Sequence, residues 1–248
     1  MKMNLGNKID IPVWQASEGI SELRAAYRKH GLVMLRNIRS KLEFLNSLSE
    51  MGGVYHHPHA EASGLTHVQV VGSSSDHAHA ADRNELGLTG MALTPHSDRS
   101  SMTLPPEFLA FWIESQSCIG GASTFVDGHR LIEEMSAHEP EAVQVLTRPK
   151  SVVFKSEEGL KESSVISLEG DEFLMRFRFD RMVYLSPDVA AVMPKFNALV
   201  RQLTMKINLT SGDGYLVNNH RWLHGRTHFA GARSAYRLLM KRPHLSPI

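Results

Sequence analysis

The chain has 248 residues, of which 42% are hydrophobic and 21% charged, as is typical of one large globular domain and not of a disordered chain. Its 27 basic and 26 acidic residues nearly cancel, so no concentrated basic surface for a nucleic-acid partner is expected. Cys118 is the only cysteine, which excludes an internal disulfide or a multi-thiolate zinc site and predicts a reducing, cytoplasmic setting. No stretch approaches the roughly 20 apolar residues of a membrane helix, and the first residues lack the apolar run of a signal peptide.

The N-terminal residues 1–65 predict two helices flanking a strand. Residues 17–30 carry apolar side chains at helical spacing after Ser17, which can cap the first turn. The apolar run over 31–37 predicts a short buried strand. A second amphipathic helix is expected over 40–53, ending on a pair of glycines.

From residue 66 the pattern changes to short apolar and β-branched runs separated by Gly, Pro, Ser and Asp, which is typical of strands. The predicted strands cover 66–72, 107–115, 122–128, 150–156, 163–170, 172–180, 214–220 and 234–242. Helical patterns interrupt them at 129–146 and 188–209, and loss of Phe196 or Leu203 from the second should destabilise the fold. Many short strands at this spacing favour a sandwich or jelly-roll barrel. We expect one α+β domain over 1–248, with 1–65 as an N-terminal layer and 66–248 as a jelly-roll with inserted helices.

Histidine is abundant, with 14 copies, several of them in 55–64 and 73–83. Such tracts can bind metal, and they are also common in solvated loops. The Gly-, Ser- and His-rich loops at 56–64 and 72–90 could form a lid over a binding site.

A histidine and an aspartate sit two residues apart at His96 and Asp98. On a strand, side chains two apart point to the same face, so both could reach one metal ion while Ser97 points away. Two imidazoles and one carboxylate are the ligand set of the non-haem Fe(II) oxygenases. A third ligand would come from the C-terminal region, where His220, His224 and His228 are equal candidates.

Four motifs together resemble the TauD/TfdA-type, clavaminate-synthase-like family of Fe(II)- and 2-oxoglutarate-dependent dioxygenases. They are "LTPHSD" (93–98), "PPEFLAFWIE" (105–114), "GGASTFVDGHRL" (120–131) and "GDGYLVNNHRWLHGR" (212–226), with an arginine shortly after. The resemblance covers more than half of the chain and implies a double-stranded β-helix (jelly-roll, cupin-like) barrel with flanking helices. It also selects His224, within "LHGR", as the third metal ligand beside His96 and Asp98, and the carboxylate of Asp98 implies oxygenation instead of halogenation.

The resemblance implies a co-substrate site as well. The far carboxylate of 2-oxoglutarate needs a cation, and arginine matches it with two parallel hydrogen bonds. Arg237, thirteen residues after His224, is the preferred candidate and Arg233 the reserve. A hydroxyl from the Gly-Gly segment is expected to assist, with Thr124 preferred narrowly over Ser123. Gln69 is a further candidate, and an ordinary structural hydrogen bond explains it equally well.

The implied activity is hydroxylation of an unactivated C–H bond in a small amino-acid-like molecule or natural-product intermediate, with O2 consumed and succinate and CO2 released. Desaturation or ring formation are variants of this chemistry. Two other classes stay open: an iron oxidase that does not use 2-oxoglutarate, and a jelly-roll that binds metal without turnover. Arg176 and Arg178 are expected on one strand face, opposite Phe177. The candidate substrate contacts are Arg99, Arg178, Arg83 and Asn218.

Overall fold

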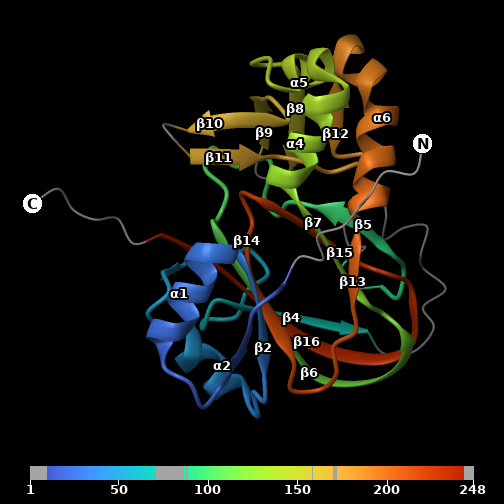
Figure 1. The fold of residues 1–248 in the computed structure, drawn as a ribbon. Coiled ribbons are helices and arrows are strands. Elements are labelled where there is room, and N and C mark those ends of the chain that lie inside the picture. The colour runs from blue at the N-terminus through green and yellow to red at the C-terminus, as the bar shows by residue number, and fades with distance from the viewer. Residues whose placement is uncertain (1–9, 71–86, 88, 158, 170–171, 243–248) are drawn as a thin grey trace, which may run out of the picture.

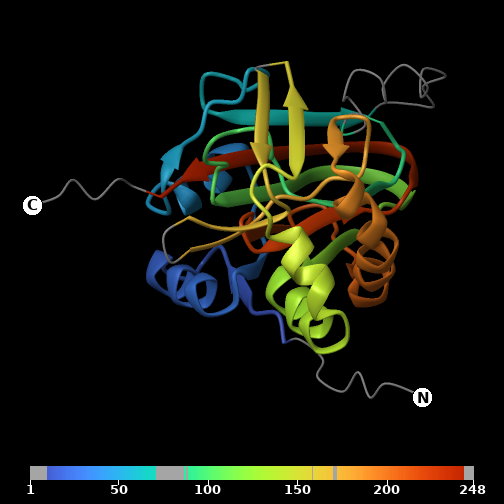
Figure 2. The same ribbon diagram turned by 90° about the horizontal axis from the view of Figure 1, so that it is seen from above.

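Two larger β-sheets dominate the computed structural model, which describes residues 10–70, 87, 89–157, 159–169 and 172–242 (Figure 1). The first sheet has seven strands in the order β1-β2-β14-β6-β16-β3, and β4 also pairs with β16. Its strands are β1 (Val13–Gln15), β2 (Leu32–Arg36), β3 (Gly53–Val54), β4 (Leu65–Val70), β6 (Phe108–Gly120), β14 (Gly214–Asn218) and β16 (Phe229–Lys241). Figure 2 shows β4, β16 and β6 running side by side, with β16 between the other two.

The second sheet is antiparallel, with four strands in the order β13-β7-β15-β5. Its strands are β5 (Leu93–His96), β7 (Ser123–Asp127), β13 (Met205–Ile207) and β15 (Trp222–Arg226). Two small sheets complete the strands: β8 (Val152–Ser156), β9 (Gly159–Ser163) and β12 (Val183–Leu185) form one, and β10 (Ile166–Glu169) and β11 (Glu172–Met175) the other.

The described helices lie in two groups at different ends of the sheets (Figure 1). One group is α1 (Ile20–His30) and α2 (Lys41–Leu48), and the other is α4 (Gly128–His138), α5 (Pro140–Leu146) and α6 (Pro187–Leu203). Within the described part of the chain, no helix has both the length and the apolar character required to cross a membrane.

Three hydrophobic clusters form the core, one under each helix group and one between the sheets. Under α1 and α2, Leu23 and Phe44 belong to one cluster with Trp112 of β6, and the rings of Phe44 and Trp112 stack. A second cluster joins the buried face of α6, including Phe196, to the second sheet and the small sheets. The third contains Phe125 of β7 and residues of β2, β6, β14 and β16, so the two larger sheets pack against each other.

The N-terminal layer has the predicted elements, but its helix ends differ from the prediction. The α1 helix begins after Gly19 without a side-chain cap, so Ser17 does not cap it. It ends at His30; the next residue, Gly31, donates its N–H to the Tyr27 carbonyl and turns the chain out of the helix with a φ of 68°, a left-handed conformation that glycine adopts readily. The α2 helix is capped by Ser40 and ends at Leu48, before the glycine pair. The β2 strand pairs with β14, so this layer extends the first sheet.

Further predicted elements are shorter in the structure. The helix expected over 188–209 ends at Leu203, and residues 205–207 form the strand β13 instead. The helix expected over 129–146 is divided at Glu139, because the residue before Pro140 is sterically kept out of the α region and has φ −143° and ψ 57°. The strand expected over 172–180 ends at Met175. Arg176 and Arg178 therefore do not share a strand face, and both Arg176 and Phe177 are buried.

Candidate metal centre and anion-binding cavity

His96 and His224 face each other across a strand pair. The β5 and β15 strands are antiparallel with His96 opposite His224, and the two imidazole rings lie 4.8 Å apart between centroids. The strands approach closely because residue 225 is glycine: a Cβ there would lie 2.3 Å from the Leu93 carbonyl oxygen. The ladder is irregular between His224 and Arg226, next to this contact.

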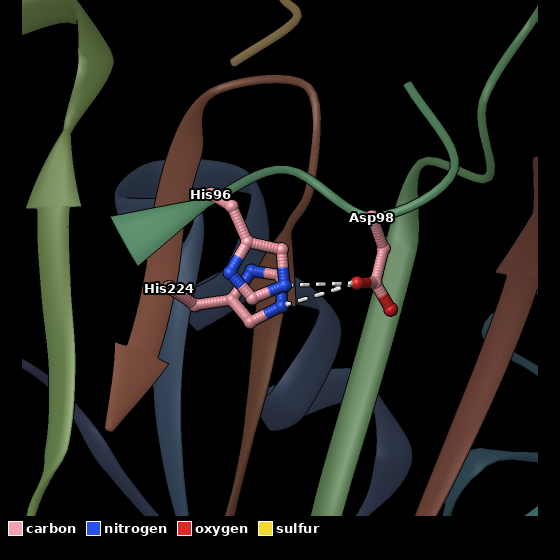
Figure 3. A group of neighbouring side chains, drawn as sticks. All are labelled: His96, Asp98 and His224. Carbon is pink, nitrogen blue, oxygen red and sulfur yellow. Dashed lines mark ion pairs between the residues drawn. The ribbon is translucent and has the colours of Figure 1, made fainter. Parts of the chain in front are cut away.

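Asp98 completes the cluster from outside the ladder. It lies in a turn after β5 ends at His96, so the expectation that both residues share one strand face is wrong. Its Oδ1 is 3.3 Å from His96 Nε2 and 3.7 Å from His224 Nε2 (Figure 3). One ligand atom from each of the three residues lies within 4.8 Å of the others.

The protonation of this cluster suits a divalent cation. His96 Nδ1 lies 2.9 Å from the Thr94 carbonyl oxygen, so the tautomer that donates this bond leaves Nε2 free to coordinate. Burial raises the pKa of Asp98, but Arg237 and the two imidazoles outweigh burial and hold that pKa well below its ordinary value. Burial lowers the pKa of His224, with Asp98 opposing it in part. Two imidazoles and an ionised carboxylate are a ligand set that fits Fe(II).

The other histidines of the C-terminal region lie elsewhere. His220 is buried, and its Nε2 is 2.8 Å from the Pro105 carbonyl oxygen. His228 is exposed. Among the described residues, no other set of three histidine, cysteine or acidic side chains gathers in this way.

A cavity beside the cluster is strongly cationic. Both larger sheets line it. Among the described residues, the charged groups that face it, besides the histidines, are the guanidinium groups of Arg226, Arg233 and Arg237 and the carboxylate of Asp98. Burial, and after it the charge of Arg233, lowers the pKa of Arg226 to about 10. Several like charges at one cavity favour a ligand with more than one negative charge. The apolar part of the wall is made by Val68, Leu93, Leu109, Phe111 and Tyr215.

Arg233 and Arg237 differ in what they contact. The Nη1 atom of Arg237 donates to Asp98 Oδ2 at 2.7 Å. The residue Arg233 is only 6% exposed, donates to the Gly121 carbonyl at 3.2 Å, and places its guanidinium over the rings of Phe111 and Phe229. Among the described residues Arg233 has no carboxylate partner, so its guanidinium is available for an anionic ligand.

Of the other predicted co-substrate contacts, one lines the cavity and two do not. Ser123 lines the cavity with Arg226 and Arg233. Thr124, the narrowly preferred residue, does not line it, and its buried hydroxyl has no hydrogen-bond partner among the described residues. Gln69 is exposed and follows Val68, which lines the cavity, so its side chain points to the opposite face of β4 and away from the site.

Three of the four predicted substrate contacts, Arg99, Arg178 and Asn218, do not line the cavity. Arg99 lies beside Asp98 and donates to the Tyr55 hydroxyl at 2.9 Å. Arg178 forms an ion pair with Asp180. The Oδ1 atom of Asn218 accepts the N–H groups of residues 220 and 221, which stabilises the turn after β14. Arg83 and most of the predicted lid at 72–90 lie outside the described residues.

Three residues near the cavity were not named individually in the sequence prediction. Arg226 belongs to the "LHGR" motif and donates to the carbonyls of Gly87 and Thr89. Tyr215 is buried between strands, and its pKa is raised mainly by burial, so its phenol stays neutral. His57 lies in the first histidine-rich tract; burial, Arg237 and Arg99 lower its pKa to about 4. The sequence could have pointed to Arg226 and Tyr215 because both lie within the 212–226 motif, and to His57 because it lies in the histidine-rich tract.

The chain matches a known protein family over nearly its whole length. The model of the family described as taurine catabolism dioxygenase TauD, TfdA family matches residues 3–242. The structure resembles PvcB from Pseudomonas aeruginosa with a TM-score of 0.69 and 15% identity, covering 92% of this chain and 84% of that chain. It resembles OrfP, solved with Fe and alpha-ketoglutaric acid, with a TM-score of 0.67 and 15% identity, over 90% and 78% of the two chains.

A third similar structure is asparagine oxygenase, solved with Fe(II), 3-hydroxyasparagine and succinate, with a TM-score of 0.67 and 14% identity over 90% of this chain and 80% of that chain. At such identities the likeness shows the fold alone.

Proposed function

The chain belongs to the taurine catabolism dioxygenase TauD, TfdA family, and from this premise we propose that it hydroxylates an unactivated C–H bond of a small amino-acid-like substrate. It is an Fe(II)- and 2-oxoglutarate-dependent dioxygenase. One oxygen atom of O2 enters the substrate and the other enters 2-oxoglutarate, so the products are an alcohol, succinate and CO2. The observation that carries the proposal is the convergence of His96, Asp98 and His224 at a cavity lined by arginines.

The proposed metal ligands are His96, Asp98 and His224. The two imidazoles would hold the ion through Nε2 and Asp98 would hold it through its carboxylate. When bound, Fe(II) with 2-oxoglutarate supplies dioxygen activation and the oxidising power for C–H cleavage. The protein holds Asp98 ionised and both imidazoles in place.

We assign the far carboxylate of 2-oxoglutarate to Arg233 with Ser123. The sequence favoured Arg237, but the ion pair of Arg237 with Asp98 and the carboxylate-free surroundings of Arg233 reverse that preference. A buried guanidinium binds a carboxylate more strongly than an exposed one, because little water competes for either group. Ser123 replaces Thr124 in this assignment because Ser123 faces the same cavity as Arg233.

Arg237 is then left to anchor the substrate through the N–H groups that Asp98 does not use: Nη1 donates to Asp98, whereas Nε has no hydrogen-bond partner among the described residues. Its side chain is 23% exposed and lines the cavity at Asp98, so a substrate carboxylate bound there would lie next to the metal ligands. OrfP and asparagine oxygenase were solved with hydroxylated arginine and hydroxylated asparagine, which supports an amino-acid carboxylate as the bound group. Amino acids and their close derivatives are therefore the proposed substrate class.

The proposed fold is a double-stranded β-helix in which the two larger sheets are the two halves, within one domain over 1–248. The active-site cavity lies between the sheets, and both contribute to its wall. The apolar side chains of Val68, Leu109 and Phe111 keep water from the reacting groups.

A substrate screen tests the proposed reaction. The protein with Fe(II), 2-oxoglutarate and O2 is incubated with each common amino acid, and succinate, oxygen uptake and product mass are measured. We expect an amino acid or close derivative to stimulate succinate release and to yield a product heavier by one oxygen atom. The Arg237→Gln variant should raise the KM for that substrate. Oxygen uptake without succinate would contradict the proposal and identify an oxidase that does not use 2-oxoglutarate.

A further inference from the structure

The metal carboxylate of Asp98 is placed differently from the two imidazoles. His96 and His224 lie opposite each other in the β5–β15 ladder, so backbone pairing sets their separation. Asp98 follows the end of β5 and has no place in that ladder. A buried backbone N–H and carbonyl outside a ladder need other partners.

The side chain of Asn219 supplies these partners. Its Oδ1 accepts the Asp98 backbone N–H at 2.7 Å, and its Nδ2 donates to the Asp98 carbonyl at 3.0 Å. The second Nδ2 hydrogen bonds the Pro106 carbonyl at 2.9 Å. The amide orientation follows from this network, because the reverse orientation would place the NH2 group against an N–H and the oxygen against two carbonyls. Asn219 is 1% exposed, so water does not compete for these bonds.

Asn219 lies five residues before His224 in the same turn-and-strand segment. Its own backbone N–H donates to the carbonyl of Glu107 at 2.7 Å, which attaches Asn219 to the residue just before β6 begins. The segment that delivers His224 therefore also holds the backbone of Asp98. We propose that Asn219 is a positioning residue that sets Fe(II) affinity by fixing Asp98 relative to His224, an inference that rests on the proposed function.

Other contacts hold the neighbouring residues of the turn. The Ser97 N–H donates to the Phe177 carbonyl at 2.8 Å, and Arg176 donates to the carbonyls of Ser100, Met102 and Thr103. Both contacts keep the turn folded, but neither bonds the backbone of Asp98 itself. Removing the amide of Asn219 therefore releases the backbone of Asp98 from its partner among the described hydrogen bonds, while the turn keeps its other attachments and Arg237 keeps its bond to the Asp98 carboxylate.

The test measures Fe(II) binding directly. Wild type, Asn219→Ala and Asn219→Asp are titrated anaerobically with Fe(II) alone by equilibrium dialysis, with no 2-oxoglutarate and no substrate. Residues that orient metal ligands typically contribute roughly 10- to 100-fold to metal affinity, so we expect the Kd to rise by about that factor in the alanine variant. The aspartate variant keeps an acceptor for the Asp98 N–H but turns an oxygen toward two carbonyls, so its Kd should rise as well.

A matched control separates positioning from general destabilisation. Asp213→Asn removes a buried polar partner just before β14, whereas Asn219 lies just after β14. The control should lower the urea midpoint and leave the Fe(II) Kd unchanged. In the Asn219 variants, excess Fe(II) should restore most of the kcat, because weakened metal binding is the main defect.

The possible outcomes are distinct. An Fe(II) Kd within about threefold of wild type in a folded Asn219 variant would overturn the inference and show that the Ser97 and Arg176 contacts suffice. If only one of the two Asn219 variants folds, the Fe(II) Kd of that variant decides whether the inference stands. A wild type that binds no Fe(II), or an Asp98→Ala variant with an unchanged Kd, would instead refute the proposed metal site itself.

Discussion

Replacement of Arg233 by lysine should weaken 2-oxoglutarate binding far more than the same replacement of Arg237. Lysine keeps the positive charge but loses the planar fork that makes two parallel bonds to a carboxylate. Arg233 is 6% exposed, so water cannot replace the lost bond as it does at a surface. Arg237 already donates to Asp98 Oδ2 and is not needed for the far carboxylate in our assignment.

The expected size follows from the energy of one charge-assisted hydrogen bond. Such a bond contributes about 1.5–3 kcal/mol, and each 1.36 kcal/mol is a factor of ten in an equilibrium constant. The Kd for 2-oxoglutarate should therefore rise by roughly 10- to 150-fold in Arg233→Lys. The assay is an anaerobic titration of 2-oxoglutarate into the Fe(II)-loaded protein, followed by the visible absorption of the chelate.

Arg237→Lys is the matched comparison at saturating Fe(II). We expect its 2-oxoglutarate Kd to stay within a few-fold of wild type while the KM for the amino-acid substrate rises. An unchanged 2-oxoglutarate Kd in Arg233→Lys, with a large rise in Arg237→Lys, would refute the assignment and restore Arg237 as the co-substrate residue.

Three further predictions concern stability and the metal centre. Phe196→Ala should lower the free energy of unfolding by about 3–5 kcal/mol, because the ring is fully buried and packs 4.8 Å from that of Phe177 between centroids. Asp213→Asn should cost about 1–3 kcal/mol at pH 7. The pKa of Asp213 is lowered because Arg36 and Thr210 outweigh the effect of burial, so this stabilisation is present above the unfolded-state pKa of about 3.9 and is lost as the pH falls through the lower folded-state value. Gly225→Ala should raise the Fe(II) Kd by at least about tenfold, because the new Cβ forces β5 away from β15 and separates the two imidazoles.

Urea unfolding measures the first two effects, and an exposed residue serves as the control for each. Leu42→Ala, at a side chain that is 67% exposed, should change stability by less than about 0.5 kcal/mol. Asp188→Asn breaks a surface ion pair and should cost less than about 1 kcal/mol. A Phe196→Ala loss as small as that of Leu42→Ala, or an Asp213→Asn loss that persists unchanged at pH 2.5, would contradict the reasoning.

Gly53→Ala is the control for Gly225→Ala, since a Cβ at Gly53 meets no atom within 4 Å. It should leave the Fe(II) Kd unchanged. Equal Kd values for wild type and Gly225→Ala would show that the close approach of β5 and β15 does not position the metal ligands.

Local patterns predicted most elements because periodicity and burial agree there. The apolar stripe of α1 and the continuous apolar run of β2 each correspond to one buried surface. The strand expected over 172–180 ends before Arg176, whose buried side chain donates to three carbonyls of a turn far away in the sequence. The local sequence pattern does not reveal such partners. Tertiary contacts decide boundaries of this kind.

The sequence predicted the metal ligands of the candidate site but not the tertiary contacts that hold them. The motifs identified His96, Asp98 and His224, and these residues converge in the structure. The spacing could not show that Asp98 leaves the strand or that Asn219 holds it, because both depend on segments 121 residues apart. Nor could spacing rank Arg233 against Arg237: the two residues lie four apart on β16, and only their contacts distinguish them.

The central claim is that Fe(II) and 2-oxoglutarate bind together at His96, Asp98 and His224. Anaerobic addition of Fe(II) and then 2-oxoglutarate to the wild type should produce the weak visible charge-transfer band of the chelate. The band should be lost in His224→Ala and kept in His228→Ala, because residue 228 is exposed and lies outside the cluster. Absence of the band in the wild type, or an unchanged band in His224→Ala, would contradict the claim.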